Sequence, residues 1–476
     1  MDRKVDVVII GAGSAGLAAL RQMLQTTENY LLIDPGPLGT TCARVGCMPS
    51  KALIEVAKDY HRLKKLWQEG IVHGAPPCDI PPCDIPAVLR HVRRLRDGFT
   101  GGMVDVTRKL AGQRLVTGTA TVLSPTRVLV DEKEVECERI ILAVGSRPIV
   151  PKAWQGFGDR VLTTDTFFEQ QDLPRRMALI GLGTNGLELG QALARLGIEV
   201  TGFGRNPHIC GIRDPEVNQA ALAAFRREFP LYAGSAAEVI PRGSALLVRN
   251  GSNEAEVDAF IAAIGTWPNF DGLGLENLGV ELNERGMPPF NPGSMQIGDL
   301  PVFIAGDANG CLPLLHEAQD EGFISGRNAT GGDVQTFRRR TPLRIGFSDP
   351  QVAAVGLTVE KLDAAKVVVG RTDFSDQSRA ILEGRNVGRL HVYVEKSTAR
   401  LLGAEMVVPD AEHLAHLLAL SIQQKLTVHE ALTAPFYHPT VEEGLRSALR
   451  DAAGKLDIRI PEELVLCESC PVQVLC

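Results

Sequence analysis

The stretch VDVVIIGAGSAGLAAL, residues 5–20, decides the fold. An apolar run that ends at Ile10 predicts a strand, and residues 14–24 have the pattern of a helix. Between the two lie three glycines, Gly11, Gly13 and Gly16. A second strand is expected at residues 30–33, and Asp34 follows it at the place of a ribose-binding carboxylate. This order is typical of a βαβ unit that holds the pyrophosphate of a dinucleotide at a helix N-terminus.

The same pattern recurs in MALIGLGTNGLELGQALARLGIEVTGFG, residues 177–204. A strand at residues 177–180 precedes a helix and a further strand that reaches Phe203. The turn contains Gly181, Gly183 and Gly186. One GxGxxG motif is a weak signal because it also arises by chance, whereas two copies in a βαβ context predict two bound dinucleotides.

Length and composition indicate several domains and small-molecule or protein partners. The chain has 476 residues, more than one ordinary domain contains. Hydrophobic residues make up 44% of it and charged residues 22%, as in folded soluble proteins. The net charge of -7 provides no positive field that would attract nucleic acid or anionic lipid.

The N-terminus resembles a secretory signal because charged residues precede an apolar run, but Asp6 and the glycines fit a phosphate-binding turn instead. No stretch approaches the roughly 18 apolar residues that a membrane span needs. We therefore expect no membrane association and a cytoplasmic protein. Its ten cysteines should be mostly reduced, so that any disulfide serves catalysis.

Two pairs of cysteines have the same spacing. The segment GTTCARVGCMPSKAL contains the first pair, Cys42 and Cys47, soon after the first glycine turn. The doubled motif PCDIP contains the second pair, Cys78 and Cys83, in what we interpret as a loop. Spacing alone does not identify the reactive pair. A reactive thiolate needs a positive field, and Lys51 beside the first pair favours that pair over the interpretation of two thiols packed as small hydrophobic residues.

Two further regions of the chain differ in composition and in predicted secondary structure from the glycine-turn units. The arginine-rich residues 85–110 predict a helix whose charged face is solvated. From Thr341 onwards, strand patterns at 388–395 and 399–408 and a helix pattern at 410–424 predict an α+β domain suited to an interface. The tail, CESCPVQVLC, adds three cysteines, Cys467, Cys470 and Cys476.

Several motifs now follow in order: GTTCARVGCMPSK, AVGSRP, GLELG, AIGTWPN, FIAGDANG, FSDPQVAAVGLT and YHPTVEEGL. With these motifs in this order, the chain resembles the class I pyridine nucleotide-disulfide oxidoreductases over residues 1–455. The resemblance implies an α/β fold with two Rossmann-like domains, one for FAD and one for NAD(P), and a C-terminal α+β dimerisation domain. The expected units are the FAD domain (1–150), the NAD(P) domain (151–270), a return to the FAD domain (271–340), the interface domain (341–460) and the tail (461–476).

The resemblance also implies cofactor contacts. Gly11, Gly13 and Gly16 would hold the FAD pyrophosphate, and Asp34 the adenosine ribose. Ala120 would contact adenine through its backbone, and Asp307 the ribityl and phosphate end of the flavin. Further FAD contacts are expected at Thr41, Lys51, Gly145 and Leu315. NAD(P) contacts are expected at Gly181, Gly183, Gly186, Arg205 and Gly265.

The redox residues are implied in the same way. Cys47 would be the thiol nearest the flavin, and Cys42 the thiol that exchanges with substrate. Lys51 would lie by the flavin ring, paired with Glu188. In HPTVEE, His438 would act as the base from the other subunit, oriented by Glu443. Histidine suits this role because it takes and returns protons near neutral pH.

We therefore expect a homodimeric enzyme that passes electrons between NAD(P)H and a disulfide or dithiol, with dihydrolipoamide dehydrogenase activity. The substrate would be a small or protein-bound disulfide, a lipoyl group above all, and a multienzyme complex is a possible partner. The alternatives are a reductase of another small disulfide or of a metal ion, and a non-catalytic flavoprotein scaffold. No resident metal site is expected.

Some residues depart from the family pattern. Gly204 occupies the position where NAD-preferring members have a glutamate, and Arg205 and Arg213 follow it, which favours NADPH. Phe436 and Tyr437 precede the histidine, where dihydrolipoamide dehydrogenases have a different sequence. The three tail cysteines have three interpretations: a thiol relay to a bulky acceptor, a zinc site one ligand short, or an end with no role.

Overall fold

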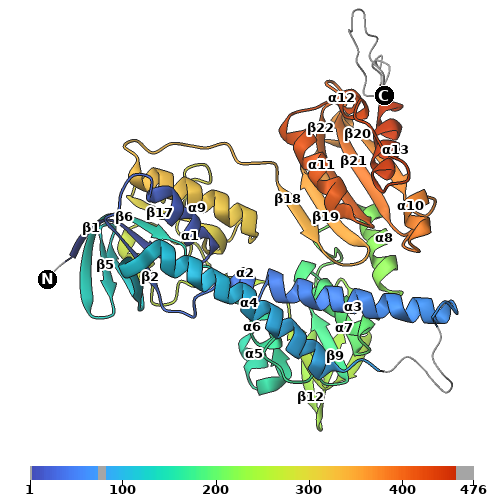
Figure 1. Cartoon of the computed structure of the whole chain (residues 1–476), viewed down its shortest axis with the longest axis horizontal. Coiled ribbons are helices and arrows are strands. Elements are labelled where there is room, and N and C mark those ends of the chain that lie inside the picture. Colours follow the sequence, from blue (N-terminus) through green and yellow to red (C-terminus); the bar gives the residue numbers. More distant parts are fainter. Residues whose placement is uncertain (1–2, 73–81, 457–476) are drawn as a thin grey trace, which may run out of the picture.

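Three main sheets organise the chain, each flanked by helices (Figure 1). The computed structural model describes residues 3–72 and 82–456. Within these residues, no helix is both long enough and apolar enough to cross a bilayer. Cys78 and the tail cysteines Cys467, Cys470 and Cys476 lie outside the described residues.

The first sheet has seven strands, in the order β3-β2-β1-β6-β5-β4, with β17 paired to β6. Its strands are β1 (Arg3–Ile10), β2 (Tyr30–Asp34), β3 (Leu115–Thr117), β4 (Ala120–Ser124), β5 (Arg127–Val130), β6 (Lys133–Leu142) and β17 (Val302–Ile304). The pairs that join β1, β2, β3, β6 and β17 are parallel. Because β17 pairs with β6, the chain returns to this sheet after building the second one.

Helices α1 (Ser14–Met23) and α9 (Leu315–Thr330) pack together beside this sheet. Their backbones come close because α9 presents glycines to α1. A Cβ atom at Gly322 would lie 2.2 Å from the Ala15 carbonyl oxygen, and one at Gly326 would lie 2.5 Å from that of Ala19. The close contact fixes the start of α1, where the first glycine turn ends.

The second sheet is parallel, with the order β11-β10-β9-β15-β8. Its strands are β8 (Val161–Leu162), β9 (Arg176–Ile180), β10 (Glu199–Gly204), β11 (Leu231–Ala233) and β15 (Ala259–Ala262). Helices α5 (Lys152–Gln155), α6 (Thr164–Phe167), α7 (Thr184–Arg195) and α8 (Pro215–Phe225) accompany it, as does a small sheet of β12 (Glu238–Arg242), β13 (Ala245–Asn250) and β14 (Asn253–Val257). A two-stranded link pairs β7 (Ser146–Pro148) with β16 (Thr266–Pro268).

The cysteine segment forms α2 (Thr41–Arg44) and the start of α3 (Cys47–Gln68), and α4 (Ile85–Ala111) packs against both. The second PCDIP copy supplies the start of α4, where Asp84 accepts a hydrogen bond from the Ala87 N–H at 3.0 Å. The expectation of a solvated arginine face holds for Arg90, Arg94 and Arg108, which are exposed, but not for Arg96. Arg96 is buried and pairs with Glu169, because α4 lies against a neighbouring segment.

The third sheet has the order β18-β19-β22-β21-β20. Its strands are β18 (Leu343–Gly346), β19 (Gln351–Gly356), β20 (Val367–Asp373), β21 (Arg389–Glu395) and β22 (Leu401–Val408), and its helices are α10 (Ser378–Leu382), α11 (Ala411–Gln423), α12 (Val428–Leu432) and α13 (Glu442–Ala453). On the edge strand β20, the Val369 carbonyl accepts a hydrogen bond from Lys455 Nζ and the Arg371 N–H donates to Asp451 Oδ2.

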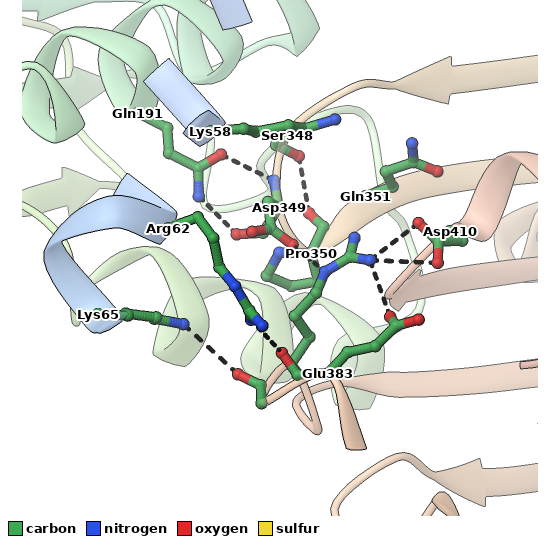
Figure 2. A network of polar contacts seen from close by, with 12 residues as sticks. Lys58, Arg62, Lys65, Gln191, Ser348, Asp349, Pro350, Gln351, Glu383 and Asp410 are labelled. Carbon is green, nitrogen blue, oxygen red and sulfur yellow. Dashed lines mark hydrogen bonds and ion pairs between the residues drawn. The ribbon is translucent and has the colours of Figure 1, made fainter. Parts of the chain in front are cut away.

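A polar junction around Asp349 ties the three units together (Figure 2). The Asp349 carboxylate pairs with Arg195 of α7 at 3.0 Å and with Arg385 at 2.9 Å. From α3, Arg62 and Lys65 donate to the backbone carbonyls of Glu383 and Gly384. Burial alone would raise the pKa of Asp349, but the charges of Arg195 and Arg385 hold it below the ordinary value.

Candidate active site

A cavity of about 350 Å³ opens at the first glycine turn. Its wall is built by the turn itself, the end of β2, the segment before α2 and the starts of the loops after β3 and β6. Six residues expected to bind FAD line it: Gly11, Gly13, Asp34, Thr41, Ala120 and Gly145. Four others do not line it, among them Lys51. Gly16 lies under the turn, Asp307 is held by Ser146 Oγ at 3.3 Å, and Leu315 starts α9 with 42% of its surface exposed.

The geometry of the turn suits a pyrophosphate. Gly11 has a φ of +106°, and a Cβ there would lie 2.2 Å from the Ala143 carbonyl oxygen. A Cβ at Gly16 would lie 1.9 Å from the Gly11 carbonyl oxygen. At Gly13, by contrast, a Cβ would meet nothing within 4 Å. Two glycines therefore let the turn close on its own backbone, and the middle one leaves a cradle at the N-terminus of α1 for an anion.

The second turn has the same geometry. A Cβ at Gly181 would lie 2.1 Å from the Ala263 carbonyl oxygen, and one at Gly186 would lie 2.0 Å from that of Gly181. A Cβ at Gly183 again meets nothing within 4 Å. The chain therefore contains two equivalent cradles, as the repeated motif predicts.

Asp34 has a contact that the sequence did not indicate. Its carboxylate accepts hydrogen bonds from the backbone N–H groups of Ala12 at 2.6 Å and Gly36 at 2.7 Å. The carboxylate at the end of β2 thus also holds the glycine turn and the following loop in place.

The two thiols of the cysteine segment lie together. Cys42 is on α2, and Cys47 is the first residue of α3, after Gly46. A hydrogen bond from Cys42, the charge of Lys51 and a backbone N–H lower the pKa of Cys47 to about 7, although burial opposes this. The same hydrogen bond, together with burial, raises the pKa of Cys42. Cys47, at a helix N-terminus, is therefore the thiol of the pair that ionises more readily, and Cys42 is the hydrogen-bond donor.

Behind the thiols, Lys51 joins two domains. Its Nζ lies 2.8 Å from Oε2 of Glu188 on α7, whose side chain is 1% exposed. The other carboxylate oxygen of Glu188 accepts a hydrogen bond from the Phe347 N–H at 2.8 Å. Lys51 Nζ also lies 4.8 Å from the centre of the Phe347 ring. The ion pair of Lys51 and Glu188 was expected from the sequence. The contact with Phe347 was not, because Phe347 follows strand β18 of the third sheet and is distant in the chain.

At the end of β10, a Cβ on Gly204 would lie 2.7 Å from Leu182 Cδ1, so the position has no room for an acidic side chain without movement of Leu182. Arg205 is exposed, and its side chain makes no hydrogen bond or ion pair within residues 3–72 and 82–456. Arg213 instead pairs with Glu360 at 3.5 Å. Gly265 has a φ of +116°, and its carbonyl accepts a hydrogen bond from the Ile149 N–H.

The predicted base lies in the third unit. His438 Nδ1 is 3.0 Å from Glu443 Oε2, and the histidine side chain is 70% exposed. Tyr437 beside it is 82% exposed. Among the described residues, no hydrogen bond joins His438 to Cys42 or Cys47. Within one subunit, the imidazole of His438 is therefore oriented by Glu443 but is not hydrogen-bonded to the thiol pair.

Cys83 differs from the first pair. It is partly buried and packs against a hydrophobic cluster that includes Leu53 and Val88. Burial raises its pKa. A raised pKa disfavours the thiolate, so Cys83 has the properties of a packing residue.

Two glycine turns, each at the end of a parallel strand, and a third unit with an antiparallel sheet define a protein that binds two dinucleotides. The chain belongs to the pyridine nucleotide-disulphide oxidoreductases, since that family model matches residues 5–322 and the dimerisation-domain model matches residues 343–449. It is accordingly a homodimeric FAD- and NAD(P)-dependent oxidoreductase with a disulfide redox centre.

Curated relatives cover nearly the whole chain. The dihydrolipoyl dehydrogenase of Thermus scotoductus is 31% identical over 93% of this chain and 96% of its own length. That of Bacillus subtilis is 28% identical over 94% and 98%. The mercuric reductase of Shigella flexneri is 28% identical over 93% of this chain and 80% of its own length.

Solved structures share the fold. The flavoprotein disulfide reductase RclA from Escherichia coli, as a Cu(II) complex, has a TM-score of 0.80 at 20% identity and covers 94% of this chain and 99% of its own. LpdA from Mycobacterium tuberculosis has a TM-score of 0.80 at 24% identity, with the same coverage.

Proposed function

We propose that this enzyme passes electrons between NADPH and a small disulfide or dithiol of the lipoyl type, through a disulfide formed by Cys42 and Cys47. The observation that carries the proposal is the pair of hydrogen-bonded thiols, with Cys42 on α2 and Cys47 at the start of α3 beside Lys51. A cysteine whose pKa is lowered to about 7 at a helix N-terminus is a good leaving thiolate, and Lys51 supports its charge.

The described residues fit the two cofactors of the family. Gly13 and the N-terminus of α1 would hold the FAD pyrophosphate, and Gly183 with the N-terminus of α7 that of the nicotinamide nucleotide. When bound, FAD supplies the two-electron link between nicotinamide and thiols. The Lys51–Glu188 pair holds α3 against α7, and therefore keeps the thiols at the boundary of the two nucleotide-binding domains.

The thiol chemistry balances without a further reactant. In the reducing direction, the Cys42 thiolate attacks one sulfur of the substrate disulfide, and the S–S bond breaks to give a mixed disulfide and one substrate thiolate. Cys47 then attacks Cys42 Sγ, which forms the Cys42–Cys47 disulfide and releases the second substrate thiolate. Two electrons leave the cysteines and two reach the substrate.

Cys42 needs a base, because its pKa is raised and its proton bonds Cys47. His438 of the partner subunit is the proposed base, with Glu443 fixing its Nδ1 so that Nε2 faces the substrate. The same imidazole protonates the departing substrate thiolates. The high exposure of His438 in one subunit supports a role across the dimer.

The preference for NADPH rests on Gly204 and Arg205. No acidic side chain is present at Gly204 to repel a ribose phosphate, and the neighbouring Arg205 is unpaired among the described residues. Arg213 is engaged with Glu360 and is not part of this proposal.

A panel of purified variants tests the function. Turnover with NADPH is measured with lipoamide, glutathione disulfide, thioredoxin and mercuric ion. Lipoamide should be the best acceptor, and Cys42→Ser and Cys47→Ser should each abolish its reduction, whereas Cys83→Ser should retain it. Higher turnover with mercuric ion than with any disulfide would instead assign a metal-ion reductase, and full activity of both serine variants at the first pair would refute the proposed disulfide.

A further inference from the structure

The cavity at the first glycine turn contains one cationic side chain. Two acidic residues line it, Asp34 and Asp271. Asp34 is bonded to backbone N–H groups, and Asp271 pairs with Arg147. Arg44, the last residue of α2, is the only lysine or arginine in the lining, which consists wholly of described residues. A cavity shaped for a diphosphate thus has a single full positive charge in its wall.

The side chain of Arg44 contains a buried polar atom, Nε, that has no hydrogen-bond partner among the described residues. The same is true of Thr100 Oγ1 on α4. The two side chains meet at Gly39, where a Cβ would lie 2.6 Å from Thr100 Cγ2 and 3.4 Å from Arg44 Cγ. Buried polar atoms without partners are rare and costly, and Arg44 lines the cavity, so its unpartnered Nε points to a ligand there.

One protein group competes for Arg44. Burial raises the pKa of Asp165 on α6, and the charge of Arg44 acts against this rise. No ion pair joins the two residues within the described chain, so Arg44 is close enough to feel the carboxylate but is not bound by it. A purely structural role for Arg44 would be to offset this partly buried charge.

We propose that Arg44 binds the diphosphate of FAD. The turn and the N-terminus of α1 contribute N–H groups and a partial charge, whereas a guanidinium adds a full charge and can bind two phosphate oxygens at once. The proposal rests on the assignment of this cavity to FAD. Arg44 is not among the cofactor contacts expected from the sequence, because the segment that contains it was interpreted only through its two cysteines.

The test measures release of FAD from the holoenzyme, followed as the rise of flavin fluorescence on dilution, at increasing NaCl concentration. Arg44→Gln should raise the Kd for FAD about 10- to 100-fold, the usual loss for a hydrogen bond to a charged group, and should flatten the salt dependence. Arg44→Lys should keep most of the salt dependence. Arg108→Gln, an exposed arginine on α4, is the matched control and should behave like the unaltered chain.

Competition separates the diphosphate from the rest of the cofactor. ADP, which has the diphosphate, should compete more weakly with FAD in Arg44→Gln than in the unaltered chain, and adenosine should compete equally in both. Thermal unfolding gives a second readout. The rise in Tm caused by FAD should shrink in Arg44→Gln, whereas a merely structural role beside Asp165 would lower Tm equally with and without FAD.

Unchanged FAD affinity and salt dependence in Arg44→Gln would overturn the proposal, as would an equal loss of adenosine and ADP binding. If Arg44→Gln does not fold, Arg44→Met decides, and normal FAD affinity with unchanged salt dependence in Arg44→Met contradicts the assignment. A failure of the cavity assignment itself is distinguishable, because a valine at Gly13 would then leave the flavin content of the purified protein unchanged.

Discussion

Lys51 Nζ lies 2.8 Å from Oε2 of Glu188, and this ion pair joins the helix that begins at Cys47 to the helix that follows the second glycine turn. Because Glu188 is almost fully buried and also accepts the Phe347 N–H, the position of Lys51 on α3 depends on α7 and on the residue that follows β18. The charge that favours the Cys47 thiolate is therefore fixed by the tertiary structure as a whole.

The first prediction concerns thiol ionisation. In the reduced enzyme, alkylation by iodoacetamide should become faster as the pH rises through about 7, where Cys47 loses its proton. Lys51→Met should shift this profile to higher pH, since it removes a positive charge that lowers the pKa of Cys47. Lys58→Met, a partly exposed lysine of the same helix that pairs with Glu55, should leave it unchanged. A shift to lower pH in Lys51→Met would contradict the assigned effect.

The second prediction compares the two cradles. Gly13→Val should yield folded protein without flavin absorbance, because the side chain fits the chain but occupies the phosphate site. Gly183→Val should retain FAD and weaken NADPH binding about 10-fold or more, measured as KM. Loss of both cofactors in either single variant would show that the two turns are not independent sites.

The third prediction concerns nicotinamide selectivity. Arg205→Gln should lower kcat/KM with NADPH about 10-fold, as expected for one lost charge-assisted hydrogen bond, and should change that with NADH little. Arg213→Gln is the control, because its guanidinium pairs with Glu360. A higher kcat/KM with NADH than with NADPH in the unaltered enzyme would count against the proposed preference.

The fourth prediction tests the base across the dimer. Separate dimers of His438→Gln and of Cys47→Ser should both be nearly inactive with lipoamide. After subunit exchange, the mixed dimer contains one site with an intact thiol pair and an intact histidine, so activity should reappear. Glu443→Gln should lower kcat more than KM, since it leaves the imidazole in place but without its acceptor. No recovery on mixing would place the base within one subunit.

The fifth prediction concerns stability. Asp349→Asn should lower the free energy of unfolding by about 2–4 kcal/mol, measured by urea denaturation, because two arginines lose their shared carboxylate. The pKa of Asp349 is below its ordinary value, so its contribution is present above about pH 4 and is lost as the pH falls through the lower folded-state pKa. The two proteins should therefore converge in acid. Asp299→Asn, on the surface, should match the unaltered chain at every pH.

The sequence predicted what repeats or lies close in the chain. The glycine turns, the Cys42 and Cys47 segment and the neighbouring Lys51 were recognisable because their chemistry depends on short spacings. The prediction of a solvated arginine face failed at Arg96, which pairs with Glu169, 73 residues away in the chain. Two further features could not be predicted from the sequence. They are the hydrogen bond from the Phe347 N–H to Glu188 and the unpartnered Nε of Arg44, because each depends on which distant segments pack together.

The edge strand β20 has a consequence for the protein at high concentration. An open strand edge offers free N–H and C=O groups to the same edge of another molecule, which is how native sheets begin to aggregate. On β20, Lys455 occupies the carbonyl of Val369 and Asp451 occupies the N–H of Arg371. A second chain would have to displace both charged side chains before it could add a strand to β20, so high protein concentration should not lead to pairing at this edge.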